Sequence, residues 1–173
     1  GFTATNKLYG VLEIAATSYG FAMVTYTGQN LGANQPKRIR EGLKAGVIIA
    51  LITSTVLGAI LILLGKPLLS LFISGTEEEI SQTLAIAYHY LSIMSVCLPI
   101  LYVLHVFRST LQGLGDTVSP MLSGVAEFAM RTGCVLLLPL WLGAEGIFYA
   151  EVLAWTGADL VLIPSCIWAL RHR

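Results

Sequence analysis

The chain has 173 residues (18.6 kDa), of which 55% are hydrophobic and only 12% charged, about half the charged fraction of a typical soluble protein. Its mean hydropathy is +0.77, and ten Lys and Arg balance ten Asp and Glu. These values exclude a disordered chain, a collagen-like fibre and a disulfide-rich scaffold, leave too little polar surface for a soluble enzyme, and provide no basic field for nucleic acid. They predict an integral membrane protein with the lipid bilayer as its surroundings.

Five segments are apolar enough to cross a bilayer as helices, which requires about 20 residues each. They are residues 8–31, 45–64, 84–107, 120–142 and 146–170. The first is the most polar and should face a cavity or other helices rather than lipid. Because the linkers are short, residues 1–173 are expected to form one all-α transmembrane domain.

The connections contain helix signals. Thr76 and Glu79 have the spacing of a capping box. Ser119 followed by Pro120 predicts a helix N-terminus, and Lys66-Pro67 predicts the end of the second span. The Gly-Leu-Gly-Asp run at residues 113–116 predicts a break after the third helix.

The basic residues predict the orientation of the chain. Seven of the ten fall on one side of the predicted topology, in the first and third connections and at the C-terminus: Lys37, Arg38, Arg40, Lys44, Arg108, Arg171 and Arg173. This side, with the C-terminus, is expected to be cytoplasmic.

The chain begins with Gly1 and shows no signal peptide, so it is expected to be part of a longer protein. Its three cysteines lie in apolar segments without metal-binding spacing, and they are interpreted as packing residues: Cys97, Cys134 and Cys166. No metal site is predicted.

Ionisable residues inside the predicted spans are the candidate functional residues, because a charge in mid-bilayer costs about 3 kcal/mol and needs a partner or a wet cavity. These residues are Glu13, His89, His105, Glu127, Arg131, Glu151 and Asp159. Glu127 and Arg131 are four residues apart and are expected to form an ion pair. Counting from the last turn places Asp159 level with about residue 129. Arg131 is therefore expected to bridge Glu127 and Asp159.

A second layer is predicted nearer the outer face, where Glu13, Glu151 and His89 lie at similar depth. No basic residue shares this layer, so its carboxyl groups are suited to taking up and releasing a proton. The alternative is that each side chain reaches the interface or bonds a neighbouring backbone group. Trp155 lies four residues from both Glu151 and Asp159, where its ring could stack on an organic cation. Aromatic packing is the simpler interpretation of Trp155, as neutral packing is of the two histidines.

Three passages carry a family resemblance: Gly-Gln-Asn-Leu-Gly-Ala at residues 28–33 with its basic loop, Leu-Gln-Gly-Leu-Gly-Asp-Thr at 111–117, and residues 146–164. Together they resemble the C-terminal half of bacterial multidrug and toxic compound extrusion (MATE) transporters. The resemblance implies a twelve-helix exporter in the bacterial cell membrane, of which this chain is the eighth to twelfth helices. Such a transporter is not an enzyme and has no cofactor. It exchanges organic, often cationic, compounds for H⁺ or Na⁺, and it would need an N-terminal lobe from the same chain.

One branch of the family uses an acidic residue before the 111–117 turn to bind the coupling cation, but Leu101 occupies that position here. The ion site therefore cannot be transferred. The spacing of Gly124, Glu127 and Arg131 resembles a different bacterial branch. The alternatives are a lipid-linked oligosaccharide flippase of the same superfamily, which should have a more basic cavity, and a non-transporting membrane scaffold subunit.

Overall fold

The computed structural model describes residues 2–73 and 76–172, with side chains described at 10, 13–73, 76–143 and 145–172. The chain forms α1 (Phe2–Gly32), α2 (Pro36–Ser70), α3 (Glu77–Gly113), α4 (Val118–Leu142), the short 3₁₀ helix η1 (Gly143–Glu145) and α5 (Gly146–Arg171). The predicted all-α membrane fold is confirmed. Each predicted span lies within one of the five long helices.

Within the described residues, four helices are long and apolar enough to cross a membrane: α2, α3, α4 and α5. The helix α1 contains residues 8–31, the most polar of the five predicted spans, and it is not among these four. The helices are longer than the predicted apolar segments, because additional helical turns with polar residues extend them at their ends. In particular, α2 runs through Pro67 to Ser70 rather than ending at Lys66-Pro67.

The starts of α3 and α4 differ in how closely they follow the predicted helix signals. The capping box at the start of α3 is present, with the Glu79 carboxylate accepting from the Thr76 N–H at 3.0 Å. The prediction that α4 begins at Pro120 is wrong, because α4 begins at Val118. The Asp116 carboxylate accepts hydrogen bonds from the backbone N–H groups of Val118 (2.9 Å) and Ser119 (3.0 Å), so it satisfies the first turn two residues earlier.

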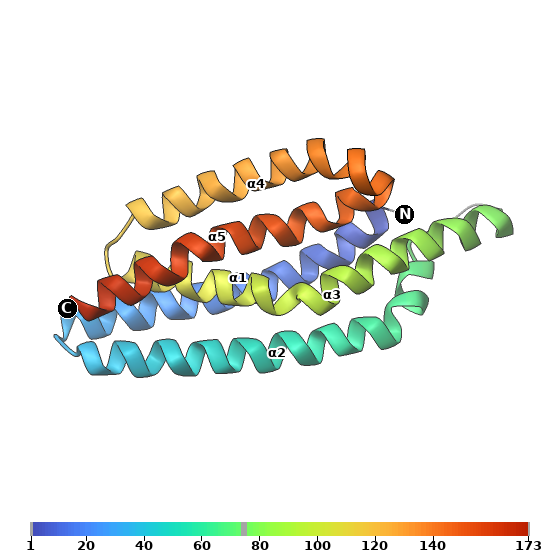
Figure 1. The fold of residues 1–173 in the computed structure, drawn as a ribbon. Coiled ribbons are helices and arrows are strands. Elements are labelled where there is room, and N and C mark those ends of the chain that lie inside the picture. Colours follow the sequence, from blue (N-terminus) through green and yellow to red (C-terminus); the bar gives the residue numbers. More distant parts are fainter. Residues whose placement is uncertain (1, 74–75, 173) are drawn as a thin grey trace.

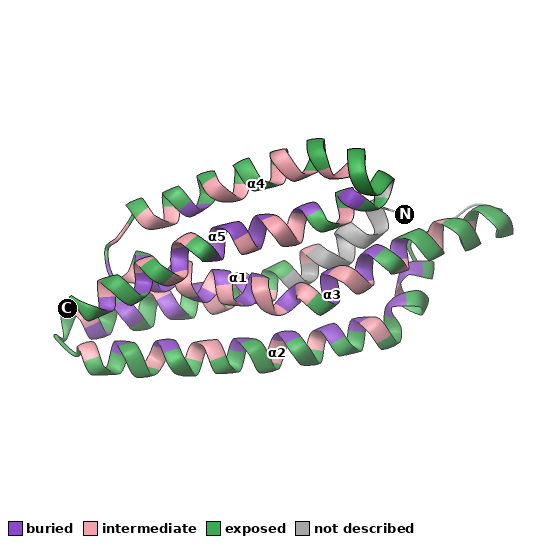
Figure 2. Ribbon diagram, in the orientation of Figure 1, coloured by how far each residue is buried: buried purple, intermediate pink, exposed green. Residues whose placement is uncertain are grey.

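The helix α3 lies at the centre of the bundle and packs against α1, α2 and α5, whereas α4 packs mainly on α5 (Figure 1). Figure 2 shows the same arrangement in the burial of the side chains: purple positions concentrate on α3 and α5, while α4 is mostly exposed. Ser123 is the buried residue identified on α4. The helix α4 therefore forms an outer layer over α5.

The helix ends fall into two groups (Figure 1). The α1–α2 turn, the α3–α4 connection and the C-terminus lie at one end, and the α4–α5 turn lies at the other. The four basic residues predicted in the first connection lie instead in the first turns of α2, because this helix begins at Pro36. The Arg40 guanidinium donates a hydrogen bond to the Leu170 carbonyl, which joins the start of α2 to the end of α5. Arg108 does not belong to this basic group, because it lies inside α3, five residues before its end. Arg173 lies outside the described residues, as does the side chain of Lys7.

Candidate functional site

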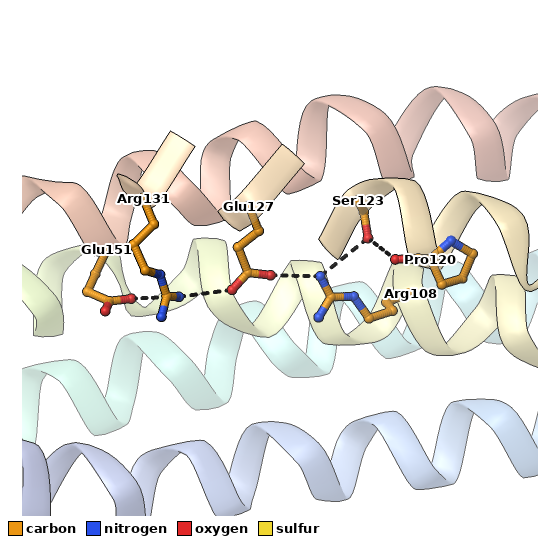
Figure 3. A network of polar contacts seen from close by, with 6 residues as sticks. All are labelled: Arg108, Pro120, Ser123, Glu127, Arg131 and Glu151. Carbon is orange, nitrogen blue, oxygen red and sulfur yellow. Dashed lines mark hydrogen bonds and ion pairs between the residues drawn. The ribbon is translucent and has the colours of Figure 1, made fainter. Parts of the chain in front are cut away.

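A chain of ion pairs joins α3, α4 and α5 (Figure 3). Glu127 Oε2 accepts from Arg108 Nη2 at 2.8 Å, and Glu127 Oε1 accepts from Arg131 Nη2 at 3.0 Å. Arg131 Nη2 also lies 2.9 Å from Glu151 Oε2. The Ser123 hydroxyl accepts from Arg108 at 3.3 Å and donates to the Pro120 carbonyl at 2.7 Å. Arg108, Ser123, Glu127, Arg131 and Glu151 are called the polar cluster below.

Local structure explains why these side chains meet. Ser123, Glu127 and Arg131 recur every four residues and therefore share one face of α4. That face is turned toward α3 and α5, because Glu127 pairs with Arg108 on α3 and Arg131 pairs with Glu151 on α5. The helices α4 and α5 also cross closely, since a Cβ added at Gly157 would lie 2.7 Å from the side chain of Met130. The connection capped by Asp116 is short, so the last turns of α3 lie beside the first turns of α4.

The polar cluster is partly buried. The exposed fractions of its charged side chains are 23% for Arg108, 20% for Glu127, 42% for Arg131 and 29% for Glu151. Each oxygen of Glu127 faces a different arginine. The buried Nε–H groups of Arg108 and Arg131 have no hydrogen-bond acceptor among the described residues. The cluster thus retains unused donor capacity.

A cavity of about 170 Å³ adjoins the polar cluster. It is lined by Glu13, Leu101, Leu104, His105, Arg108, Glu127, Arg131, Glu151 and Trp155. A water molecule occupies about 30 Å³ in the liquid, so the space suffices for a few waters or for one group of a ligand. Three carboxylates and two guanidiniums line it, which leaves one formal negative charge when His105 is neutral.

The predicted Glu127–Arg131 pair is confirmed, but the second partner of Arg131 is Glu151 and not Asp159. Counting residues from the turn between the last two helices predicted the depth correctly, since Met130 and Gly157 lie level with each other. Such a count does not predict the direction in which each side chain points around its helix axis. Glu151 and Asp159 are eight residues apart, which separates them by about 80° around a helix of 3.6 residues per turn. The prediction that Glu151 has no basic partner is also wrong, because the long Arg131 side chain reaches its layer.

The remaining predicted residues divide between several places. Glu13 and Trp155 line the cavity of the polar cluster; Glu13 is exposed and Trp155 is 1% exposed. Asp159 lines a different cavity. The ring centroid of His89 lies 6.0 Å from that of Phe148 with the two rings tilted by 59°, while His105 lines the cavity of the polar cluster.

Arg108 is a member of the site that was not predicted, because it lies just beyond the predicted third span at residues 84–107. The sequence does contain information that places Arg108 beside the fourth helix. The depth count that was applied to the last hairpin places Arg108 level with Ser123 when it is applied to the α3–α4 hairpin, and these two side chains are in contact.

Comparison with known proteins identifies the family. The MatE profile matches residues 1–132, about three quarters of the chain. The chain belongs to the MatE family. The members of this family are membrane transporters rather than enzymes, so the resemblance noted in the sequence is confirmed at family level.

One curated relative of this MatE chain is the FAD transporter of Shewanella oneidensis. The two are 25% identical over 139 residues, which cover 80% of this chain and 28% of the relative. The chain thus spans less than a third of the length of that relative. No solved structure gives a significant match.

Proposed function

We propose that this MatE chain is part of a transporter that exports organic compounds, often cations, in exchange for H⁺ or Na⁺. The observation that carries the proposal is the polar cluster with its cavity, enclosed by helices of membrane-spanning length. Charged groups in such helices are costly and commonly mark ion or substrate pathways. The excess of one carboxylate in the cavity favours a cationic ligand.

Glu151 is the carboxylate best placed to exchange a cation during transport. It terminates the chain of ion pairs and shares Arg131 with Glu127. Glu151 can therefore lose its contact with Arg131 while both arginines keep Glu127 as a partner. Its neighbours in the cavity include Glu13 and Trp155, which supply a second carboxylate and an aromatic surface for an organic cation.

Glu151→Gln in the full-length protein tests this role. Glutamine preserves size and an oxygen acceptor for Arg131 but carries no charge. We expect normal protein level and loss of ion-driven efflux of a fluorescent organic cation from energised membrane vesicles. Glu145→Gln is the matched control, because Glu145 is an exposed carboxylate in η1. Full-rate efflux by Glu151→Gln with unchanged dependence on pH and Na⁺ would remove Glu151 from the mechanism.

A second candidate function is export of an anionic aromatic compound. It is favoured by the likeness to the FAD transporter and by the unused Nε–H donors of Arg108 and Arg131 in a cavity that also contains Trp155. Donors of this kind suit phosphate or carboxylate oxygens. Measuring FAD and the organic cation in the same vesicles separates the two: export of FAD alone would favour the anionic substrate.

We also propose that the protein resides in the bacterial cell membrane with its C-terminus in the cytoplasm. The proposal is supported by the basic first turns of α2, which lie at the same end of the bundle as the C-terminus, because the positive-inside rule favours a cytoplasmic location for such an end.

A further inference from the structure

A groove between α1 and α2 lies apart from the polar cluster and shares no lining residue with its cavity. Its volume is about 530 Å³, within the range of about 300–1,000 Å³ that is usual for ligand pockets. It lies in the half of the bundle that contains the α1–α2 turn (Figure 1). Most of its lining is small or apolar, including Ala22, Met23, Gly42, Ala45, Gly46 and Ile49.

Two glycines allow side chains of α1 to lie against α2 along this groove. A Cβ added at Gly42 would overlap the ring of Tyr26, and one added at Gly46 would lie 2.7 Å from the sulfur of Met23. The Tyr26 hydroxyl donates to the Arg38 carbonyl at 3.0 Å, which holds the two helices together at this end of the groove. The outer side is open, since 51% of the surface of Ile49 is exposed.

The groove ends at a basic stretch of α2. Residues 37–44 contain four basic side chains and one acidic one, Glu41, and all five are exposed. Arg38 lies four residues before Gly42, so it shares the face of α2 that lines the groove. None of the ion pairs between described residues involves Arg38. Its guanidinium is therefore available to a ligand at the mouth of the groove.

The groove thus changes from charged to apolar along its length. The apolar segment of α2 begins at residue 45, directly after the basic stretch, and α2 is apolar enough to cross a membrane. A bilayer changes in the same direction, from charged headgroups to hydrocarbon. A ligand that matches both parts of the groove carries a phosphate or carboxylate at one end and a long apolar chain at the other.

We propose that this groove binds an anionic phospholipid of the surrounding membrane, with an acyl chain between α1 and α2 and the headgroup phosphate on Arg38. A guanidinium binds phosphate oxygens through two N–H groups at once. The basic stretch carries three formal positive charges, which favours a lipid with a net negative charge over a zwitterionic one. The site is independent of the proposed export, because lipid binding is measurable without transport.

Native mass spectrometry of the full-length protein tests the lipid preference. The protein is delipidated in detergent and titrated with phosphatidylglycerol or with phosphatidylethanolamine of identical acyl chains. We expect phosphatidylglycerol to bind severalfold more tightly, because its headgroup has a net negative charge. Equal affinities for the two lipids would overturn the proposal, as would the absence of any retained lipid, which is expected if another part of the full-length protein fills the groove.

Charge variants test the position of the headgroup. Arg38→Gln should weaken binding of phosphatidylglycerol about fivefold, the contribution of one basic residue near an anionic lipid. Arg171→Gln is the matched control, because Arg171 is exposed at the same end of the bundle but lies on α5. Equal losses in both variants would indicate diffuse attraction and overturn the site. Glu41→Gln should strengthen binding, and a loss instead would indicate a lipid with an ammonium group and reject the anionic assignment.

Photocrosslinking tests the position of the acyl chain. Phosphatidylglycerol with a diazirine in its acyl chain is expected to label residues 19–26 and 41–49, which peptide mass spectrometry identifies. Ala45→Phe fills the groove and should abolish this labelling. Ile48→Phe is the matched control, because Ile48 is exposed on α2 but is not among the lining residues. Both variants should unfold at the wild-type temperature. Labelling that persists in Ala45→Phe, or that falls outside these two ranges, would overturn the proposal.

Discussion

Glu127 is the residue on which the polar cluster depends, because each of its two oxygens accepts from a different arginine. Arg131 is shared in turn between Glu127 and Glu151. The loss of Arg131 therefore leaves its two partners in different situations: Glu127 keeps Arg108, whereas Glu151 loses its ion-pair partner. Removing one member of a buried pair costs more than the pair itself contributes, because the remaining charge is stranded.

This asymmetry predicts the outcome of a rescue experiment. Arg131→Ala should destabilise the full-length protein by about 2 kcal/mol, less than for a fully buried pair, since its side chain is 42% exposed. Adding Glu151→Gln should recover part of the loss by neutralising the stranded carboxylate. Adding Glu127→Ala instead should worsen it, because Arg108 then loses its carboxylate as well. Thermal unfolding in detergent measures all three variants, and equal stability of the two double variants would contradict the arrangement of the pairs.

The backbones of α2 and α3 approach each other closely at Gly58. A Cβ added at Gly58 would lie 2.5 Å from the backbone oxygen of Ser95, far inside van der Waals contact. Pro99 follows four residues later in α3 and has no N–H, so the Ser95 carbonyl lacks its usual helical donor. Small residues at helix crossings allow this close approach in membranes, where lipid provides no hydrophobic force between helices.

Gly58→Ala should therefore separate the two helices and destabilise the protein by about 1–3 kcal/mol, the usual cost of overpacking. Gly124→Ala is the matched control, because a Cβ at Gly124 meets nothing within 4 Å. Alanine there should be neutral or stabilise α4 by up to about 1 kcal/mol through its higher helix propensity. Denaturant unfolding in the same detergent measures both variants. If the two behave alike, α2 and α3 do not cross as closely as described.

At the scale of the whole molecule, the bundle has a basic end and an end with few basic residues. The basic start of α2 and the end of α5 meet through Arg40 and the Leu170 carbonyl, and the α3–α4 connection lies at the same end (Figure 1). The acidic first turn of α3, with Glu77, Glu78 and Glu79, begins at the opposite end. This distribution supports the proposal that the C-terminus lies in the cytoplasm.

Cysteine labelling tests the orientation. In a full-length protein without its native cysteines, Gln35→Cys is expected to react only with reagents that reach the cytoplasm. Thr76→Cys is expected to react from outside intact cells. Both positions are exposed and lie at opposite ends of the bundle. The reverse labelling pattern would show that the end with the C-terminus faces the outside of the cell, and it would contradict the proposed orientation.

The amino-acid sequence by itself determined the features that depend on local chemistry. Runs of apolar residues predicted the five helices because a spanning helix needs a fixed apolar length. The capping box of α3, the break after Gly113 and the Glu127–Arg131 pair all follow from contacts within a few residues. Local prediction also has a limit, which Asp116 illustrates. Its carboxylate accepts from the Val118 N–H, so α4 begins at Val118 and not at the predicted Pro120.

Only the tertiary structure decided which distant side chains meet. Counting along a hairpin predicts depth, but the rotation of each helix about its axis is set by packing, as where Met130 meets Gly157. Because of that rotation, Arg131 forms an ion pair with Glu151, and Asp159 lies beside a separate cavity. It also brought Arg108, which had been assigned to a connection, into contact with Glu127. An ion pair between two helices forms only at a suitable distance between the helices and a suitable rotation of each about its axis. Both are fixed by the packing of the entire bundle.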